Sequence, residues 1–214
     1  MKYIKLFESM TEIEVEKICK KYGIRNWTLN PDGTVDVDGN VDLSVQKLSK
    51  LPLKFGRVTG SFWCENNKLT SLEGCPTEIR GDFSCAGNQL TSLEGCPREI
   101  GGNFYCQSNQ LTSLEGCPTE IGGNFYCSYN QLTSLKGAPE YIEGQVNFIP
   151  NGNLPVYIKQ ILELNDNNKD IQKYILKWQK DYSIWRRDGS FNQDRFILMM
   201  EYAGDELPKL KLPK

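Results

Sequence analysis

Cysteine is the residue type of this chain with the widest range of possible chemistry, because a thiolate can bind a metal, attack an electrophile or form a disulfide. Most of the cysteines fall into two rows with a period of 21 residues. The rows are Cys64, Cys85, Cys106 and Cys127, and Cys75, Cys96 and Cys117. The next position of the second row is Ala138, which can fill a core but cannot form a bridge. We therefore expect reduced thiols packed in a core, with a metal site or disulfides as the less favoured alternatives.

The sequence lacks the residues that would activate a thiol or complete a metal site. It contains no histidine, which excludes Ser–His and Cys–His nucleophile pairs and every histidine metal site. It also has no Cys-x-x-Cys pair, which argues against a zinc ribbon. Asp32, Asp36, Asp38 and Asp42 could suggest calcium, but they lack the Glu-terminated loop of an EF-hand and fit alternating solvent-facing strand positions better. We expect no metal and no cofactor.

Two carboxylates, Glu65 and Asp82, lie on neighbouring repeats and could act together as an acid and a base. No metal set or phosphate-binding loop accompanies them in the sequence. A solvated polar face explains both residues better, so an enzyme is the least favoured of the functional interpretations.

A repeat of 21 residues must position all of these groups. Two sequence motifs, Leu-Thr-Ser-Leu-Glu-Gly-Cys-Pro and Gly-Asn-Phe-Tyr-Cys, recur with small variations between Phe62 and Ile142. A weaker copy precedes them, because Val41 and Leu43 match Phe62 and Cys64 one period later. A fixed period of this length predicts a solenoid, in which each coil buries its apolar face against its neighbours.

Each repeat begins with a short predicted strand. Phe104 and Cys106 alternate with Asn103, Tyr105 and Gln107, which is the period of a strand with one buried face. An asparagine follows each strand (Asn67, Asn88, Asn109 and Asn130), where its side chain can bond to the backbone of adjacent coils. The pairs Gly101-Gly102 and Gly122-Gly123 permit a tight re-entry into the next strand.

Different segments flank the repeats. Ser9 or Thr11 can cap a short helix that ends at Gly23, and Pro31-Asp32-Gly33 marks a hairpin. Three amphipathic helices are predicted within 154–164, 170–181 and 191–203, before a Pro- and Lys-rich tail. The expected organisation is a helix and β-hairpin cap (1–40), a solenoid (41–150) and a helical cap with a tail (151–214).

Composition and charge narrow the kinds of partner and the cellular location that the sequence allows. The chain has 214 residues and a formal net charge of −2, which argues against a nucleic-acid partner because such proteins usually carry a basic face. Its start lacks the apolar run of a signal peptide, and no stretch approaches the ~20 apolar residues of a membrane span. We expect a soluble, cytoplasmic protein with no membrane partner.

The order Phe-x-Cys-x-x-Asn-x-Leu-x-x-Leu resembles the leucine-rich-repeat signature. The short repeat and the Pro after its last Leu look like bacterial effector repeats. The wording Asn-Gln-Leu-Thr-Ser-Leu-Glu-Gly-Cys-Pro is more similar to leucine-rich-repeat proteins of large tailed bacteriophages, and so is the opening Met-Lys-Tyr-Ile-Lys-Leu-Phe-Glu. The resemblance implies an α/β solenoid, a short leucine-rich-repeat array with a parallel β ladder on its concave face. It implies no activity, and the ubiquitin-ligase domain of some effectors is not expected after Cys127.

The outward positions of the ladder form the predicted binding surface. Large aromatic side chains facing solvent suit interface anchors, although stacking across strands would also explain them. The candidate partner-binding residues are Trp63, Glu65, Asp82, Ser84, Tyr105, Gln107, Tyr126 and Tyr129. Arg186 and Arg187 are a secondary candidate, for which a charged turn is the simpler explanation.

Three functional classes remain open from the sequence. A non-enzymatic module that binds a protein is favoured. A phage-encoded copy would bind a host protein such as an antiviral defence component, and inhibition of that protein is one expected result of binding. A virion structural or adhesin component is the second class. A small enzyme acting through carboxylates of the concave face is the third.

Overall fold

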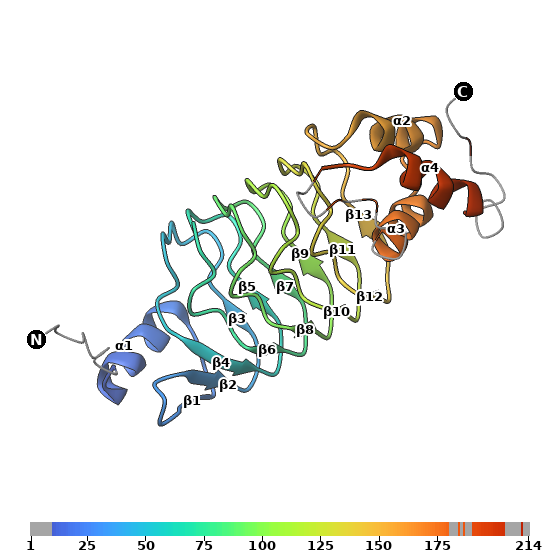
Figure 1. Ribbon diagram of the computed structural model, residues 1–214. Helices are drawn as coiled ribbons and strands as arrows, with labels where there is room; N and C mark the ends of the chain where they lie inside the picture. The colour runs from blue at the N-terminus through green and yellow to red at the C-terminus, as the bar shows by residue number, and fades with distance from the viewer. Residues whose placement is uncertain (1–9, 180–183, 185, 187–189, 204–210, 212–214) are drawn as a thin grey trace, which may run out of the picture.

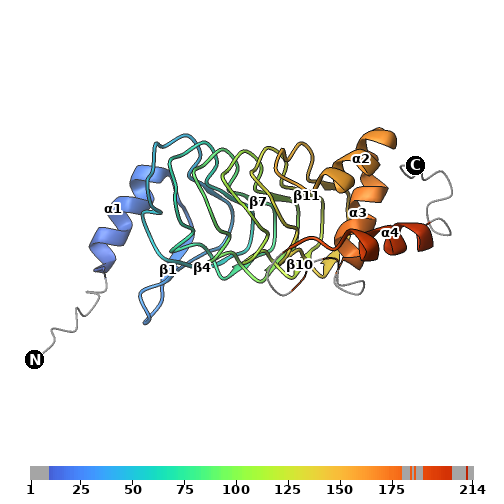
Figure 2. The same cartoon turned by 45° about the horizontal axis from the view of Figure 1, so that its top comes forward.

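The protein is a β-solenoid with helices at both ends (Figure 1). The computed structural model describes residues 10–179, 184, 186, 190–203 and 211. The coils stack in sequence order, with helix α1 (Glu12–Tyr22) at one end and helices α2 (Val156–Leu164), α3 (Lys169–Trp178) and α4 (Gln193–Tyr202) at the other (Figure 2). The predicted solenoid with a helix and hairpin at its start and helices at its end is therefore confirmed.

The predicted parallel ladder is a six-stranded sheet. Its strands are β3 (Val41–Asp42), β5 (Phe62–Trp63), β7 (Phe83–Ser84), β9 (Phe104–Tyr105), β11 (Phe125–Tyr126) and β13 (Val146–Asn147). Each residue pairs with the residue one repeat later, as Phe104 does with Phe125. Because the register never shifts along this sheet, equivalent side chains form straight rows.

A second sheet of seven strands runs beside the first and was not predicted; in each coil three residues separate the end of its strand from the start of the first sheet's strand, as between Ile100 and Phe104. It starts with the expected hairpin, β1 (Trp27–Leu29) and β2 (Val35–Val37), and continues in parallel. The remaining strands are β4 (Phe55–Val58), β6 (Glu78–Ile79), β8 (Glu99–Ile100), β10 (Glu120–Ile121) and β12 (Tyr141–Ile142). The isoleucines of these strands, Ile79, Ile100, Ile121 and Ile142, are buried in the core.

The core between the sheets is a column of aromatic rings and thiols. Phe62, Phe83, Phe104 and Phe125 are fully buried. The ring of Phe104 lies 5.3 Å from that of Phe83 and 5.6 Å from that of Phe125, and each pair is stacked. Buried apolar area of this kind is the main source of stability in a solenoid, where each coil contacts only its neighbours.

Asparagine side chains tie each coil to the next. The Asn109 amide donates hydrogen bonds to the carbonyls of Cys85 (3.0 Å) and Cys106 (3.2 Å). Its oxygen accepts a hydrogen bond of 3.0 Å from the Leu90 backbone N–H. Asn67, Asn88 and Asn130 repeat this pattern one period apart. The predicted role of the asparagine row is confirmed, and each side chain satisfies backbone groups that the strands leave unpaired.

Glycine is required where two coils come closest. A Cβ atom on Gly101 would lie 2.1 Å from the Arg80 carbonyl oxygen, and one on Gly122 would lie 2.4 Å from that of Gly101. Both contacts are with backbone, which cannot move aside without breaking the ladder. The Gly-Gly pairs therefore set the spacing between coils.

The terminal helices begin and end at residues suited to those positions. Thr11 is the N-cap of α1 and forms a capping box with Glu14, and Gly23 ends the helix in the left-handed conformation. At the other end Gln172 of α3 accepts a hydrogen bond of 2.8 Å from the Phe148 N–H. The helix thereby covers the last strand, β13, and supplies the partner that a further coil would have given.

The structure contains free thiols and no disulfide among the described residues. The first row, from Cys64 to Cys127, is buried, whereas Cys96 and Cys117 of the second row are only partly buried. Burial raises the pKa of the Cys64, Cys85 and Cys106 thiols well above the ordinary value. The thiolate, which is the reactive form, is therefore disfavoured in the folded protein.

We expect most thiols of the folded protein to resist alkylation at pH 8, with slow reaction confined to Cys96 and Cys117, and all of them to react in denaturant. Since the folded-state pKa values lie above the unfolded value of about 9, the thiols cost no stability below pH 9 and lower it as the pH rises further. Labelling followed by mass spectrometry, and unfolding curves between pH 7 and pH 10, measure both effects. Rapid labelling of Cys64 or Cys106 in the folded state would contradict the core assignment.

Candidate partner-binding site

The outward side chains of the six-stranded sheet form three straight rows, which we call the strand face. The first row is Asn40, Ser61, Asp82, Asn103, Asn124 and Gln145. The second is Asp42, Trp63, Ser84, Tyr105, Tyr126 and Asn147. The third is Ser44, Glu65, Ala86, Gln107 and Ser128.

The side chains of the first row form hydrogen bonds that hold successive coils together. The Asp82 carboxylate accepts hydrogen bonds from the Asn103 backbone (2.7 Å) and side chain (3.0 Å). The Asn103 side-chain oxygen in turn accepts one of 2.8 Å from the Asn124 N–H. Asp82, selected from the sequence as a partner-binding residue, thus has a structural role and borders the surface that remains available.

The second row contains the predicted aromatic anchors. The rings of Tyr105 and Tyr126 lie 5.0 Å apart and are parallel within 2°, so the stacking alternative applies to this pair. Each ring is only partly buried and keeps a surface toward solvent. Trp63 lies two strands from Tyr105, with the small Ser84 between them.

The gap above Ser84 is a hollow in the strand face. Its volume is about 450 Å³, and it is lined by Asp42, Ser44, Trp63, Glu65, Ser84, Tyr105 and Gln107. Five of these residues were predicted from the sequence as partner-binding residues: Trp63, Glu65, Ser84, Tyr105 and Gln107. Asp42 and Ser44 were missed, although both lie exactly one repeat before Trp63 and Glu65 and the period alone could have identified them.

Ser84 is the floor of this hollow and not an exposed contact residue. Only 1% of its surface is accessible, because larger residues of the neighbouring strands stand on both sides. Its hydroxyl donates a hydrogen bond to one carboxylate oxygen of Glu65. The side chain therefore fixes the position of Glu65 at the rim.

Two polar groups at the hollow have capacity to bind a ligand. Among the described residues, the second carboxylate oxygen of Glu65 has no hydrogen-bond donor, and the Gln107 side-chain oxygen is buried without a partner. Burial, followed by the nearby Asp82 carboxylate, raises the pKa of the Tyr105 hydroxyl, which is therefore protonated at neutral pH and can donate a hydrogen bond. The hollow is thus lined by acceptors from Glu65 and Gln107 and by the aromatic side chains of Trp63 and Tyr105.

The remaining candidates lie outside the hollow. Tyr126 extends the aromatic row on the next strand. Tyr129 follows the strand in the left-handed conformation (φ 54°) and is 65% exposed. Arg186 is exposed, and its guanidinium donates a hydrogen bond of 2.7 Å to the Phe191 carbonyl, as expected for a turn; Arg187 lies outside the described residues.

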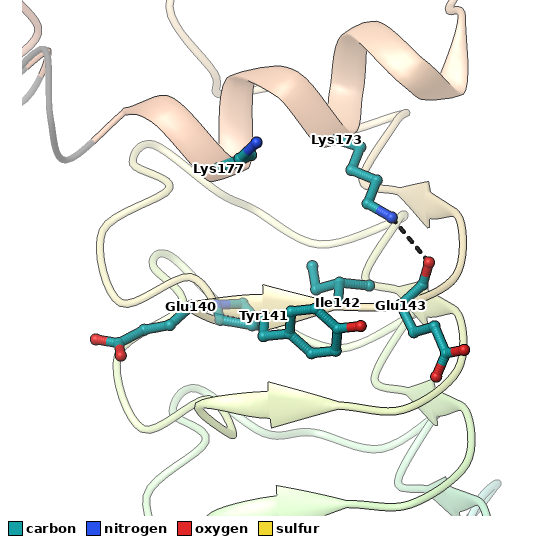
Figure 3. A pocket seen from close by; sticks show the side chains of 7 residues that line it. Glu140, Tyr141, Ile142, Glu143, Lys173 and Lys177 are labelled. Carbon is teal, nitrogen blue, oxygen red and sulfur yellow. Dashed lines mark hydrogen bonds between the residues drawn. The ribbon is translucent and has the colours of Figure 1, made fainter.

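A second hollow of about 230 Å³ lies between β12 and α3 (Figure 3). Tyr141, Ile142 and Glu143 form one side, and Lys173 and Lys177 form the other. The Lys173 ammonium donates hydrogen bonds of 2.9 Å to the carbonyls of Glu143 and Gly144. This lysine therefore satisfies backbone carbonyls that follow the edge strand of the seven-stranded sheet. The hollow is thus part of the contact between the sheet and the helical cap.

The aspartates that could have suggested calcium are engaged in backbone and side-chain bonds. Asp32 accepts hydrogen bonds from Thr34 within the hairpin, and Asp36 accepts one of 2.8 Å from the Arg57 N–H. Within the described residues, no cluster of three or more cysteine and acidic side chains has the arrangement of a metal site. None of the helices in that part of the chain is long and apolar enough to cross a membrane.

Comparison with known proteins gave no match: no family model, no curated protein and no solved structure is significantly similar to this chain. The strand face and the sequence resemblance are therefore the features from which a function can be proposed.

Proposed function

We propose that the protein is a non-enzymatic module that binds another protein through the strand face. One observation carries the proposal: Trp63, Tyr105 and Tyr126 form a half-exposed aromatic row on a rigid sheet whose opposite side is filled by phenylalanine and cysteine. Trp and Tyr are the residues most often found as anchors of protein interfaces.

The dimensions and rigidity of the strand face suit a macromolecular partner. Six strands at ~4.8 Å spacing span roughly 25 Å, which is comparable to one side of a standard protein interface. Backbone ladders and the asparagine row hold every strand in place, so little conformational entropy is lost on binding. In the third row the small residues Ala86 and Ser128 alternate with larger ones, so the surface is uneven and a partner's side chains can fit into it.

The resemblance to leucine-rich-repeat proteins of tailed bacteriophages supports a more specific version. In it, the protein is phage-encoded, acts in the cytoplasm of the infected cell, and binds and inhibits a host protein such as an antiviral defence component. The free thiols support this compartment, because a reducing cytoplasm keeps cysteines unpaired.

The test is an affinity capture from host lysate with the wild type and a Trp63→Ala/Tyr105→Ala/Tyr126→Ala variant. We expect the variant to lose the partner, since removing one central anchor costs about 2 kcal/mol, or roughly thirtyfold in affinity. Tyr141→Ala is the matched control, because this tyrosine is 56% exposed on the other sheet. Circular dichroism must show that the triple variant is folded.

Two outcomes would contradict the proposal. A partner that the folded triple variant still binds would exclude the strand face as the site. A partner that is lost only on Arg186→Ala would place the site on the C-terminal helices instead.

A further inference from the structure

The strand face carries charge of a single sign. Its charged residues are Asp42, Glu65 and Asp82, and no lysine or arginine occurs in its three rows. The ion pairs of the described residues lie elsewhere: Arg57 with Asp36, Arg80 with Glu78, and Lys136 with Glu115. All three carboxylates lie in the first half of the face: Asp42 and Glu65 line the hollow, and Asp82 lies two positions before Ser84 on the same strand segment. The chain as a whole is nearly neutral, so this local excess of negative charge favours a cationic partner.

The hollow lies where Ser84 interrupts the aromatic row, between Trp63 and Tyr105. Tyr105 and Tyr126 on adjacent strands stack at 5.0 Å and leave no room between them. Trp63 and Tyr105 are separated by two strand spacings, ~9.6 Å along the sheet, because Ser84 occupies the strand between them. The space between the two side chains therefore fits one flat group about as thick as an aromatic ring.

Hydrogen-bond acceptors border the same space. Glu65 offers its second carboxylate oxygen, and Gln107 offers the side-chain oxygen that is buried without a donor. These two residues belong to the third row and stand on either side of the small Ala86. A group that fills the hollow must therefore donate several hydrogen bonds to be held there, and a positive charge would be favoured by Glu65 and Asp42.

We infer that the hollow binds the guanidinium group of an arginine side chain presented by the partner protein, an inference that rests on the function proposed above. Guanidinium is planar, stacks on aromatic faces and carries its donors in a rigid fork, so it matches the gap between Trp63 and Tyr105 and the acceptors of Glu65 and Gln107. A lysine ammonium has the charge but not the flat shape, and it would leave the hollow incompletely filled.

The direct test uses the short peptide acetyl-Gly-Arg-Gly-amide and the NMR signal of the Trp63 indole, which is assigned by its loss in Trp63→Phe. We expect the signal to shift with a dissociation constant on the order of 1 mM, the strength of one stacked and charge-assisted contact. The uncharged citrulline peptide should cause no shift, and the lysine peptide should bind several-fold more weakly. Trp27 and Trp178, which lie away from the hollow, serve as internal controls. Absence of a Trp63 shift with the arginine peptide, or an equal shift with citrulline, would overturn the inference.

Two variants separate this inference from the proposed function. Glu65→Gln removes the charge and should weaken arginine-peptide binding at least tenfold, whereas Glu120→Gln on the other sheet should leave it unchanged. Ser84→Tyr supplies the missing ring, so the variant should fold, extend the tyrosine stack and lose the peptide. A natural partner that survives both variants but is lost in the triple aromatic variant would disprove the arginine contact and leave the strand-face function intact. A partner that also survives the triple variant would disprove both.

Discussion

Replacing Phe104 by Ala should lower the free energy of unfolding by about 3–5 kcal/mol, the range measured for aromatic side chains removed from a closed core. Phe104 is fully buried between the stacked rings of Phe83 and Phe125, so its removal leaves a cavity in the middle of the array. The coils on each side are fixed by backbone ladders and can collapse only partly onto the space. Urea unfolding monitored by circular dichroism measures the loss.

Tyr105→Ala is the matched control for this change, because the residue is next in the chain but points outward. It should cost about 1 kcal/mol, mainly the stacking on Tyr126. A loss below about 1 kcal/mol for Phe104→Ala, well short of the range for buried aromatics, would mean that the inward and outward faces are assigned the wrong way round.

Replacing Asn109 by Ala should destabilise the protein by about 3 kcal/mol without creating a large cavity. The Leu90 N–H would lose its acceptor, the Asn109 side-chain oxygen, and remain buried, which is the costly part of the change. The Cys85 and Cys106 carbonyls would each keep one donor, from Asn88 and Asn130 respectively. The loss of stability should therefore be close to the cost of one buried N–H without an acceptor, plus a smaller cost for two carbonyls that each lose one of their donors.

The adjacent Gln110→Ala is the control, since this residue is exposed and should change stability by no more than about 0.5 kcal/mol. Hydrogen exchange offers a second measurement. In Asn109→Ala the amides of Leu90 and its neighbours should exchange faster, while those of the first coils keep their protection. Equal stability of the two variants would show that the asparagine row is not needed to hold the coils together.

The sequence predicted the parts of the fold that the repeat encodes. The alternation around Phe104 identified the buried and outward sides of the ladder, and the asparagine at a fixed place in each repeat identified its bonding role. The second sheet was missed because a strand such as Glu99–Ile100 buries a single side chain and shows no alternation, whereas Phe104 and Cys106 mark the buried positions of their strand. Their pairing depends on the close packing of whole coils, which becomes visible only in the structure.

The candidate site was predicted as a surface but not as a shape. Register placed Trp63, Glu65, Tyr105 and Gln107 outward, and the structure brings them together around one hollow. The hollow exists because Ser84 is small where its neighbours are aromatic, and the sequence treated that serine as one more contact residue. The structural bonds of Asp82 were not predicted either, because they come from Asn103 in the next coil.

Because the register of the strand face never shifts, one whole repeat can be gained or lost without disturbing the alignment of the others. An in-frame duplication or loss of a whole repeat within the array would return every row to alignment, and only the caps would meet a different neighbour. Each such event would lengthen or shorten the surface by three outward positions, one in each row. Recombination between repeats could therefore generate new outward surfaces without a new core, and a protein engineer could use the same route.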